Sequence, residues 1–129
     1  RLEISVFGEG LRRWLHIVAS LIRYPGAVLV IDGIDAGLHP YLGRETTTLL
    51  LQQIQTLGSQ VFASTHNLEF VDALLLSAYG DDGSPTGEAE DPIVVFTLRQ
   101  GEDGMHHVRR RSGREAWAAR QDVAAELRG

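Results

Sequence analysis

The stretch AVLVIDGIDAGLHP, residues 27–40, decides the fold. Its first five residues are apolar and run without interruption into Asp32, between Pro25-Gly26 on one side and Gly33 on the other. A short apolar run rich in β-branched residues, bounded in this way, predicts a strand that is buried on both faces, as in the centre of a parallel sheet. An acid at the carboxyl end of such a strand lies where open α/β sheets bind their ligands.

A strand of this form is typical of a Walker B motif, in which the terminal Asp holds Mg²⁺ for a nucleoside triphosphate. The alternative is that Asp32 is an ordinary turn carboxylate, since many buried strands end in Asp. The motifs on either side of the strand decide between the two interpretations.

Length and composition narrow the class of protein. A chain of 129 residues that is 43% hydrophobic and 22% charged fits one globular domain with a core of its own. The net charge of -5 argues against a surface that coats nucleic acid. No apolar run approaches the roughly 20 residues of a membrane helix, the first residues do not resemble a signal peptide, and there is no cysteine. We therefore expect a cytoplasmic protein without a membrane partner.

The chain contains no lysine, because all twelve basic residues are arginines. A Walker A loop requires a glycine-rich turn followed by Lys and then Ser or Thr, so no segment here can be that loop. The chain also opens on Arg1 rather than Met. If this is a P-loop domain, residues 1–129 are then a single partial domain, the carboxyl-terminal part, and the Walker A segment comes from upstream sequence.

Periodicity predicts alternating strands and helices around the central strand. We expect a strand over 2–7, a helix from about residue 11 to 23, a second helix from Pro40 to about residue 57, a strand over 60–64, and a third helix capped by Asn67. The buried stripe predicted for the first helix consists of Leu11, Leu15, Val18 and Ile22. For the second helix it consists of Leu42, Thr46, Leu49, Leu50, Ile54 and Leu57.

The last third of the chain changes in character. Residues 79–91 are rich in Gly, Asp, Glu, Ser and Pro and predict an exposed loop. A β-hairpin is expected from residues 93–98 and 105–109, followed by a helix that opens on a capping box of Ser112 and Glu115. The fold class is therefore α/β, with a mostly parallel sheet flanked by helices and a terminal hairpin and helix.

Three turns lie at comparable places, each beside a strand end or a helix start. They are Gly8-Glu9-Gly10-Leu11-Arg12-Arg13, the segment 32–40 and Ser64-Thr65-His66-Asn67. In this order they resemble the signature, Walker B plus D-loop, and switch-histidine motifs of ABC-type ATPases. The resemblance extends to the prokaryotic AAA and overcoming-lysogenization-defect-like ATP-binding proteins, which are related to the ATPase heads of structural-maintenance-of-chromosomes proteins. It covers residues 4 to about 75, and its most specific part is the Gly-Leu-His-Pro tail at 37–40.

The resemblance implies a P-loop NTPase-like fold that uses ATP and Mg²⁺ in an ATP-sandwiched head-to-tail homodimer. Asp32 would coordinate Mg²⁺ and His66 would contact the γ-phosphate, whereas the alternative for His66 is a cap of the next helix. Gly8, Glu9 and Gly10 would present a helix N-terminus to ATP bound by the partner, a placement that suits an anion. Their alternative is a tight strand-to-helix turn.

The same resemblance assigns the rest of the loop after the strand. The D-loop region, with Gly37 and His39, would touch its counterpart across the dimer, or it is simply a glycine turn before a Pro-started helix. Asp35 matches the family's second acid and would support the metal or the dimer interface; otherwise it is a solvated turn acid.

Gly33 departs from the family pattern, which places the general base Glu at this position. Glycine has no proton acceptor in its side chain, so we expect slow hydrolysis or none. Two functions follow, an ATPase and, as the alternative, an ATP-dependent dimerisation switch that does not hydrolyse. A third interpretation is a fragment with no nucleotide affinity.

Other charged groups are weaker candidates. His106 and His107 are neighbours on an expected strand and so point to opposite faces, which suits no single metal. The cluster Arg109-Arg110-Arg111 with Arg114 indicates either contact with DNA or a solvated surface. Five acids in and beside the expected loop are interpreted as loop residues rather than a nuclease metal site: Asp81, Asp82, Glu88, Glu90 and Asp91.

Overall fold

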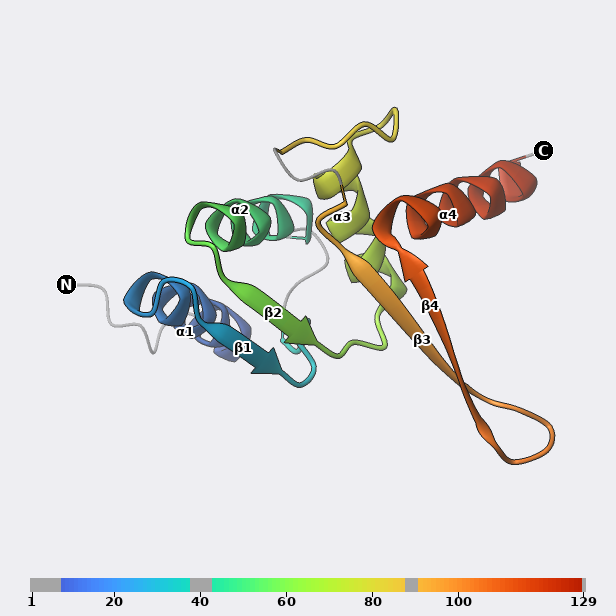
Figure 1. Cartoon of the computed structure of the whole chain (residues 1–129), viewed down its shortest axis with the longest axis horizontal. Coiled ribbons are helices and arrows are strands. Elements are labelled where there is room, and N and C mark those ends of the chain that lie inside the picture. The colour runs from blue at the N-terminus through green and yellow to red at the C-terminus, as the bar shows by residue number, and fades with distance from the viewer. Residues whose placement is uncertain (1–7, 38–42, 88–90, 129) are drawn as a thin grey trace. The chain divides into compact units, whose positions relative to one another are not determined.

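A computed structural model describes residues 8–37, 43–87 and 91–128, with side chains as far as Asp122 (Figure 1). The elements in order are α1 (Glu9–Arg23), β1 (Val28–Ile31), α2 (Gly43–Thr56), β2 (Gln60–Ala63), α3 (Leu68–Tyr79), β3 (Val94–Gln100), β4 (His106–Ser112) and α4 (Gly113–Arg128). The α/β class and the terminal hairpin and helix are confirmed. The strand expected over 2–7 lies outside the described residues.

The chain divides into two compact units, Arg1–Ser77 and Ala78–Gly129. In the first, β1 and β2 pair in parallel, with Val28 opposite Gln60 and Ile31 opposite Ala63. In the second, β3 and β4 pair antiparallel. That residues 1–129 act as a single partial domain stays a prediction.

The core of the first unit lies on one face of the β1–β2 pair. Leu29, Ile31 and Val61 turn toward a cluster built by α1, α2, α3 and the loop after β1. Its buried members are Trp14, Ile17, Leu21, Ile34, Leu50 and Phe70. Alternation along a strand sends the other residues to the opposite face.

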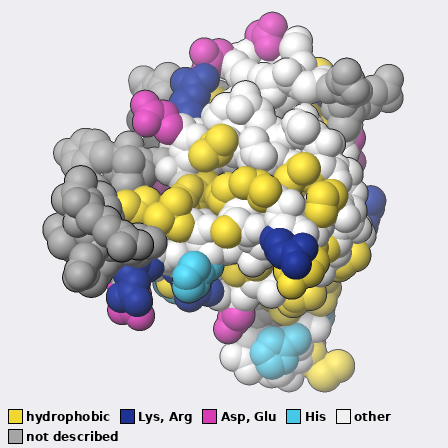
Figure 2. All heavy atoms as spheres, turned by 90° about the vertical axis from the view of Figure 1, so that its left-hand side faces the viewer, with side chains coloured by type: hydrophobic (Ala, Val, Ile, Leu, Met, Phe, Trp, Pro, Cys, Tyr) yellow, Lys and Arg dark blue, Asp and Glu magenta, His cyan; other side chains and the backbone are white. Residues whose placement is uncertain are grey.

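The opposite face of the pair is open, so the expectation of a strand buried on both faces is wrong for the described residues. Val28, Val30 and Phe62 are 60%, 81% and 52% exposed. The physical reason is that the described helices cover one face of β1 and β2 only, which leaves half of the apolar run without a partner. Apolar side chains reach the surface elsewhere too, and Figure 2 shows a band of them on one face of the molecule.

The predicted helical stripes are partly wrong. In α1 the buried apolar residues are Trp14, Ile17 and Leu21, whereas Leu15 and Ile22 are exposed. Leu49 of α2 is also exposed, and the buried residues there include Thr46, Thr47, Leu50 and Leu51. Both helices carry apolar residues on more than one stripe, and tertiary packing selects which stripe is buried.

Two predicted helix caps are confirmed. The Asn67 side-chain oxygen accepts hydrogen bonds from the N–H groups of Glu69 and Phe70, at 3.0 and 3.3 Å. In the capping box, Glu115 accepts from the Ser112 N–H at 2.8 Å and its own N–H donates to the Ser112 hydroxyl at 3.2 Å. Each cap satisfies backbone N–H groups that a helix start leaves without partners.

Tyr79 corrects the start of the expected loop 79–91. It is the last residue of α3 and is fully buried, with its hydroxyl donating to the Asp91 carboxylate. Burial, followed by the neighbouring Asp91, raises the pKa of Tyr79. Although partial burial opposes it, the hydrogen bonds from Tyr79 and from the Arg114 N–H hold the pKa of Asp91 below its ordinary value.

Candidate functional site

The loops that follow β1 and β2 run side by side at the carboxyl ends of the two strands. Backbone hydrogen bonds continue past the strand ends, from the Ser64 N–H to the Ile31 carbonyl and from the Ile34 N–H to the Ser64 carbonyl, both at 3.0 Å. The segment 32–37 therefore lies against the segment 64–67, as the carboxyl ends of parallel neighbours should.

Asp32 is exposed at this edge, and one of its carboxylate oxygens is fixed. The Ser64 hydroxyl donates to Asp32 Oδ1, and the same hydroxyl oxygen accepts from the Gly33 N–H at 2.9 Å. In addition, the Arg13 guanidinium of α1 donates to the Asp32 backbone carbonyl. Ser64 thus fixes one carboxylate oxygen and Arg13 fixes the backbone of the same residue, while the second carboxylate oxygen has no hydrogen-bond partner within the described residues.

Asp35 is held by the next hydroxyl along the same loop. The Thr65 hydroxyl donates to Asp35 Oδ1 at 2.5 Å and accepts from the Asn67 N–H at 3.0 Å. Both acids after β1 are therefore bonded to consecutive residues after β2. Asp35 is half-buried and follows the buried Ile34, so it is part of the packed loop rather than a freely solvated turn acid.

His66 follows these two hydroxyl residues directly. Its side chain is exposed and makes no hydrogen bond within the part of the chain that the structure describes. The alternative that His66 caps the next helix is wrong, because Asn67 caps α3. Both ring nitrogens of His66 are therefore available to solvent or to a ligand.

Gly33 occupies a backbone conformation that suits glycine, with φ of 60°. A Cβ there would find space, since the nearest atom is the Ala36 Cβ at 3.9 Å. The left-handed conformation nonetheless costs other residues about 1–2 kcal/mol. This position thus lacks the carboxylate that the resemblance implies and holds a turn that disfavours one.

The α1 N-terminus packs directly on the loop after β1. Gly10 is buried, and a Cβ on it would lie 1.8 Å from the Gly37 carbonyl oxygen. Gly37, at φ of 77°, would meet Gly10 in the same way. This contact could not be predicted from the sequence, since a Gly in each of two turns does not reveal that the turns touch.

Gly8 and Glu9 are the exposed residues of this helix start. Gly8 is the N-cap, with no side-chain cap, and has open space around it. The exposed Glu9 carboxylate favours the helix dipole but repels an approaching anion. Because Gly10 is covered by Gly37, Gly8 is the more open of the two glycines.

The remaining candidates are not brought into this site. His39 lies outside the described residues, and so do Glu88 and Glu90. Asp91 is bonded to Tyr79 in the second unit. His106 and His107 lie on opposite faces of β4, as expected. Among the described residues, no three His, Cys, Asp or Glu side chains gather as a metal site.

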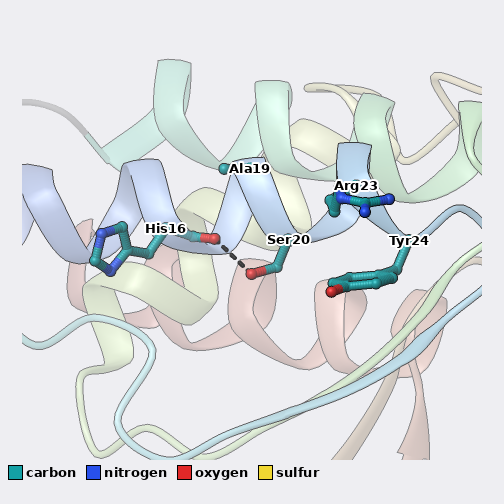
Figure 3. Close-up of a pocket in the computed structure, with 5 residues that line it drawn as sticks. All are labelled: His16, Ala19, Ser20, Arg23 and Tyr24. Carbon is teal, nitrogen blue, oxygen red and sulfur yellow. Dashed lines mark hydrogen bonds between the residues drawn. The ribbon is translucent and has the colours of Figure 1, made fainter.

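A hollow of about 340 Å³ opens along α1 but contains none of these residues. Figure 3 shows its lining of His16, Ala19, Ser20, Arg23 and Tyr24, with the Ser20 hydroxyl donating to the His16 carbonyl at 2.8 Å. The Arg23 guanidinium lies 5.3 Å from the centre of the Tyr24 ring. This hollow is a surface feature of one helix rather than part of the site.

The donor set fits Mg²⁺ only as a partial site. Mg²⁺ prefers oxygen ligands and, in nucleotide sites, often takes one or two carboxylates, with water and substrate phosphates filling the other positions. The second oxygen of Asp32 meets that requirement. A complete protein cage is absent from the described residues, so phosphate would have to supply the rest.

Comparison with known proteins identifies the family. Residues 1–72, more than half of the chain, match the family described as "AAA domain, putative AbiEii toxin, Type IV TA system". The chain belongs to this AAA-domain family. All of the acids, hydroxyls and glycines of the site lie inside the matched residues.

Two relatives differ in how much of them the chain covers. An "ATP/GTP phosphatase" of Helicobacter pylori is 32% identical over 77 residues, which is 57% of this chain and 21% of that protein. An uncharacterized protein of Methanocaldococcus jannaschii is 27% identical over 122 residues, 95% of this chain and 99% of its own length. The chain thus spans about a fifth of the Helicobacter relative. No solved structure matches it.

No helix within the described residues is both long and apolar enough to cross a lipid bilayer.

Proposed function

We propose that this chain supplies the metal-binding and γ-phosphate-facing part of an ATP-hydrolysing domain. The observation that carries the proposal is a pair of hydroxyl–carboxylate hydrogen bonds, Ser64 to Asp32 and Thr65 to Asp35, which join the loop after β2 to the loop after β1. His66 follows the two hydroxyl residues directly in the sequence. The AAA family match and the similarity to an ATP/GTP phosphatase support the same activity.

In this proposal each side chain has a separate task. Asp32 would hold Mg²⁺ through its free oxygen, directly or through water, while Ser64 keeps the other oxygen in place. His66 would donate a hydrogen bond to the γ-phosphate and help to orient the attacking water. Mg²⁺, when bound, supplies the positive charge that offsets charge developing on the phosphates.

The phosphate-cradling lysine would come from a segment beyond residues 1–129. The chain has no lysine, and the open face of the β1–β2 pair, with Val28, Val30 and Phe62, offers an apolar surface for another layer to cover. Exposed apolar patches of this kind commonly mark interaction surfaces. On this proposal, the chain is the carboxyl-terminal part of a P-loop domain.

The active form would be a homodimer with ATP between the subunits. The α1 start would face ATP of the partner, and the loop with Gly37 and His39 would meet its counterpart. The contact between Gly10 and Gly37 supports treating these two segments as one continuous surface. Because Glu9 is negative, contact with phosphate would use backbone N–H groups near Gly8.

The test is Mg-ATP turnover by residues 1–129 joined to the segment that supplies the lysine. The natural sequence would be compared with Asp32→Ala and Gly33→Glu, and Gly33→Gln would serve as a matched control for the strain of a side chain at φ of 60°. Turnover that Asp32→Ala abolishes supports an ATPase. If Asp32→Ala leaves turnover and ATP affinity unchanged, the proposed metal role is wrong.

The second candidate is an ATP-held dimerisation switch that does not hydrolyse. The lack of an acceptor at Gly33, in a backbone conformation that disfavours Glu, is the observation in its favour. It predicts a dimer that is stable in Mg-ATP without turnover, with hydrolysis gained in Gly33→Glu and not in Gly33→Gln. A dimer that dissociates as phosphate is released would favour the ATPase instead.

Two finer assignments complete the proposal. We place the chain in the overcoming-lysogenization-defect-like subgroup related to structural-maintenance-of-chromosomes heads, on the Gly-Leu-His-Pro tail at 37–40. We also propose that it acts in the cytoplasm, where ATP and Mg²⁺ are available and a chain without cysteine needs no oxidising environment.

A further inference from the structure

The β3–β4 hairpin gathers arginines that have no partner. Within the described residues, no hydrogen bond, ion pair or ring contact involves the side chain of Arg99, Arg109, Arg110 or Arg111. Arg13 and Arg23, in contrast, are engaged by a backbone carbonyl and by a tyrosine ring. The chain carries 17 acids, so carboxylates were available to pair with these arginines.

The register of the hairpin puts three of these arginines on one face. Thr97 lies opposite Arg109 and Val95 opposite Arg111, while Arg99 lies opposite His107. Directly opposed residues point to the same side of an antiparallel pair, so Arg99, Arg109 and Arg111 share a face with His107. We call these three arginines the basic face. Arg110 points to the other side, beside Phe96.

Neighbouring like charges destabilise a sheet unless an anion offsets them. Arg109 and Arg111 are two residues apart on one strand, a spacing of about 7 Å, and Arg99 is a diagonal neighbour of Arg109 across the pair. The hairpin's own carboxylates, Glu102 and Asp103, lie in the turn at its tip, and Asp103 contacts His107 at 3.4 Å. Over the middle of the strands, the hairpin therefore offers no carboxylate that could neutralise the basic face.

We propose that the basic face binds the phosphate backbone of duplex DNA. A row of guanidinium groups at this spacing suits an anion that repeats along a chain better than a single phosphate group. Arginine binds phosphate through paired N–H donors, and the major groove of DNA admits a two-stranded β-ribbon. The proposal does not depend on ATP binding, so it can fail or succeed independently of the ATPase function.

A membrane surface fits the hairpin less well. The apolar residues Val94, Phe96 and Leu98 alternate with the basic face and lie on the opposite side of β3. A hairpin that inserted this apolar side into a bilayer would turn Arg99, Arg109 and Arg111 away from the anionic headgroups. An acidic protein segment is the other rival, and the experiment below separates it from DNA.

The test is the salt dependence of binding to a fluorescent 24-base-pair duplex, measured with the chain of residues 1–129. Three phosphate contacts predict a slope of log affinity against log salt of about -2.7, so that affinity falls about 40-fold between 50 and 200 mM salt. Arg109→Gln should reduce the slope to about -1.8, so that its affinity falls only about 12-fold over the same range of salt. The triple Gln variant at 99, 109 and 111 should abolish binding.

Arg110→Gln is the matched control, because it removes the same charge from the same strand on the opposite face. It should leave the slope near the natural value. Circular dichroism of every variant checks that the hairpin and the rest of the chain stay folded. A triple variant that is folded and does not bind supports the proposal.

Four results would overturn the proposal. The first is no binding to the duplex at 50 mM salt, and the second is an equal loss of duplex affinity in Arg109→Gln and Arg110→Gln. The third is tighter binding to the single strand of the same sequence than to the duplex. The fourth is binding to polyglutamate, or to vesicles with one-third anionic phospholipid, that is as tight as binding to the duplex. Equal binding to polyglutamate would instead identify an acidic protein partner for the same face.

Discussion

The contact between Gly10 and Gly37 allows a prediction that can be worked out from distances. In Gly10→Ala the new Cβ would lie 1.8 Å from the Gly37 carbonyl oxygen and 2.2 Å from its carbonyl carbon, whereas ordinary contact begins at 3.4 Å. The atoms must separate by about 1.6 Å, the difference between 3.4 and 1.8 Å. Both partners are backbone, so no side-chain rotation can make room.

The expected cost follows from two opposing effects. Overpacking of a tight contact costs about 1–3 kcal/mol, and a backbone clash belongs at the upper end. Alanine in place of glycine in a helix gains up to about 1 kcal/mol. We therefore expect Gly10→Ala to lower the free energy of unfolding by about 2 kcal/mol.

The assay is urea unfolding and thermal melting of the chain. A loss of about 2 kcal/mol should lower Tm by roughly 10 °C for a cooperative unit of the size of the first one. Gly8→Ser is the control, since a Cβ at Gly8 meets nothing within 4 Å and Ser is a favourable N-cap. We expect it to change stability by less than about 0.5 kcal/mol. A Gly10→Ala protein as stable as the natural one would show that α1 does not pack on the loop after β1.

Three further predictions concern the caps and buried bonds. Asn67→Ala should lower the free energy of unfolding by about 1 kcal/mol, read from the urea midpoint, because the helix N–H groups of Glu69 and Phe70 lose their acceptor; an unchanged midpoint would contradict the cap. Thr47→Val should lower the free energy of unfolding by about 1–2 kcal/mol in the same assay, because the fully buried hydroxyl bonds to Ser77 Oγ at 2.8 Å and donates to the Ala73 carbonyl at 3.2 Å. Thr48→Val, on the same helix and less buried, is the matched variant for comparison. The pKa of Asp91 is lowered in the folded state, so the Asp91 carboxylate stabilises the fold above the unfolded pKa near 4, and this stabilisation is lost as pH falls through the folded pKa. Asp91→Asn should therefore lower the free energy of unfolding at pH 7 and make its decrease below pH 4 less steep. An acid transition as steep as that of the natural protein would refute this.

Local features of the fold were predictable from the sequence. Asn67 and the pair of Ser112 and Glu115 act on N–H groups within three residues, so their spacing alone identifies them. The α/β order is equally local, because it follows from periodicity and from turn residues. By contrast, the prediction of the buried stripe of α1 was wrong. The observed set, Trp14, Ile17 and Leu21, recurs at helical spacing, and so does the predicted set. Only packing against the rest of the unit chooses between them.

The candidate site was predictable in its acids but not in its hydroxyls. Asp32 and Asp35 stand out because they follow an apolar strand. Ser64 and Thr65 bond to them from 32 and 30 residues away, and such distant pairs leave no signal in spacing. The signal that could have indicated them is that two small polar residues, Ser64 and Thr65, directly follow the next strand. Arg13 lies in the first of the three turns, but the sequence pattern assigns it no role, although its guanidinium donates to the Asp32 backbone carbonyl.

Whether Asp32 holds the metal for ATP can be tested by the effect of Mg²⁺ on ATP affinity. It would use residues 1–129 joined to the segment that supplies the phosphate-binding lysine, with calorimetry in the presence of Mg²⁺ and of EDTA. We expect Mg²⁺ to tighten ATP binding in the natural sequence and in Gly33→Gln, and we expect Asp32→Ala to remove this tightening while leaving affinity in EDTA unchanged. The same tightening by Mg²⁺ in Asp32→Ala would show that Asp32 does not hold the metal.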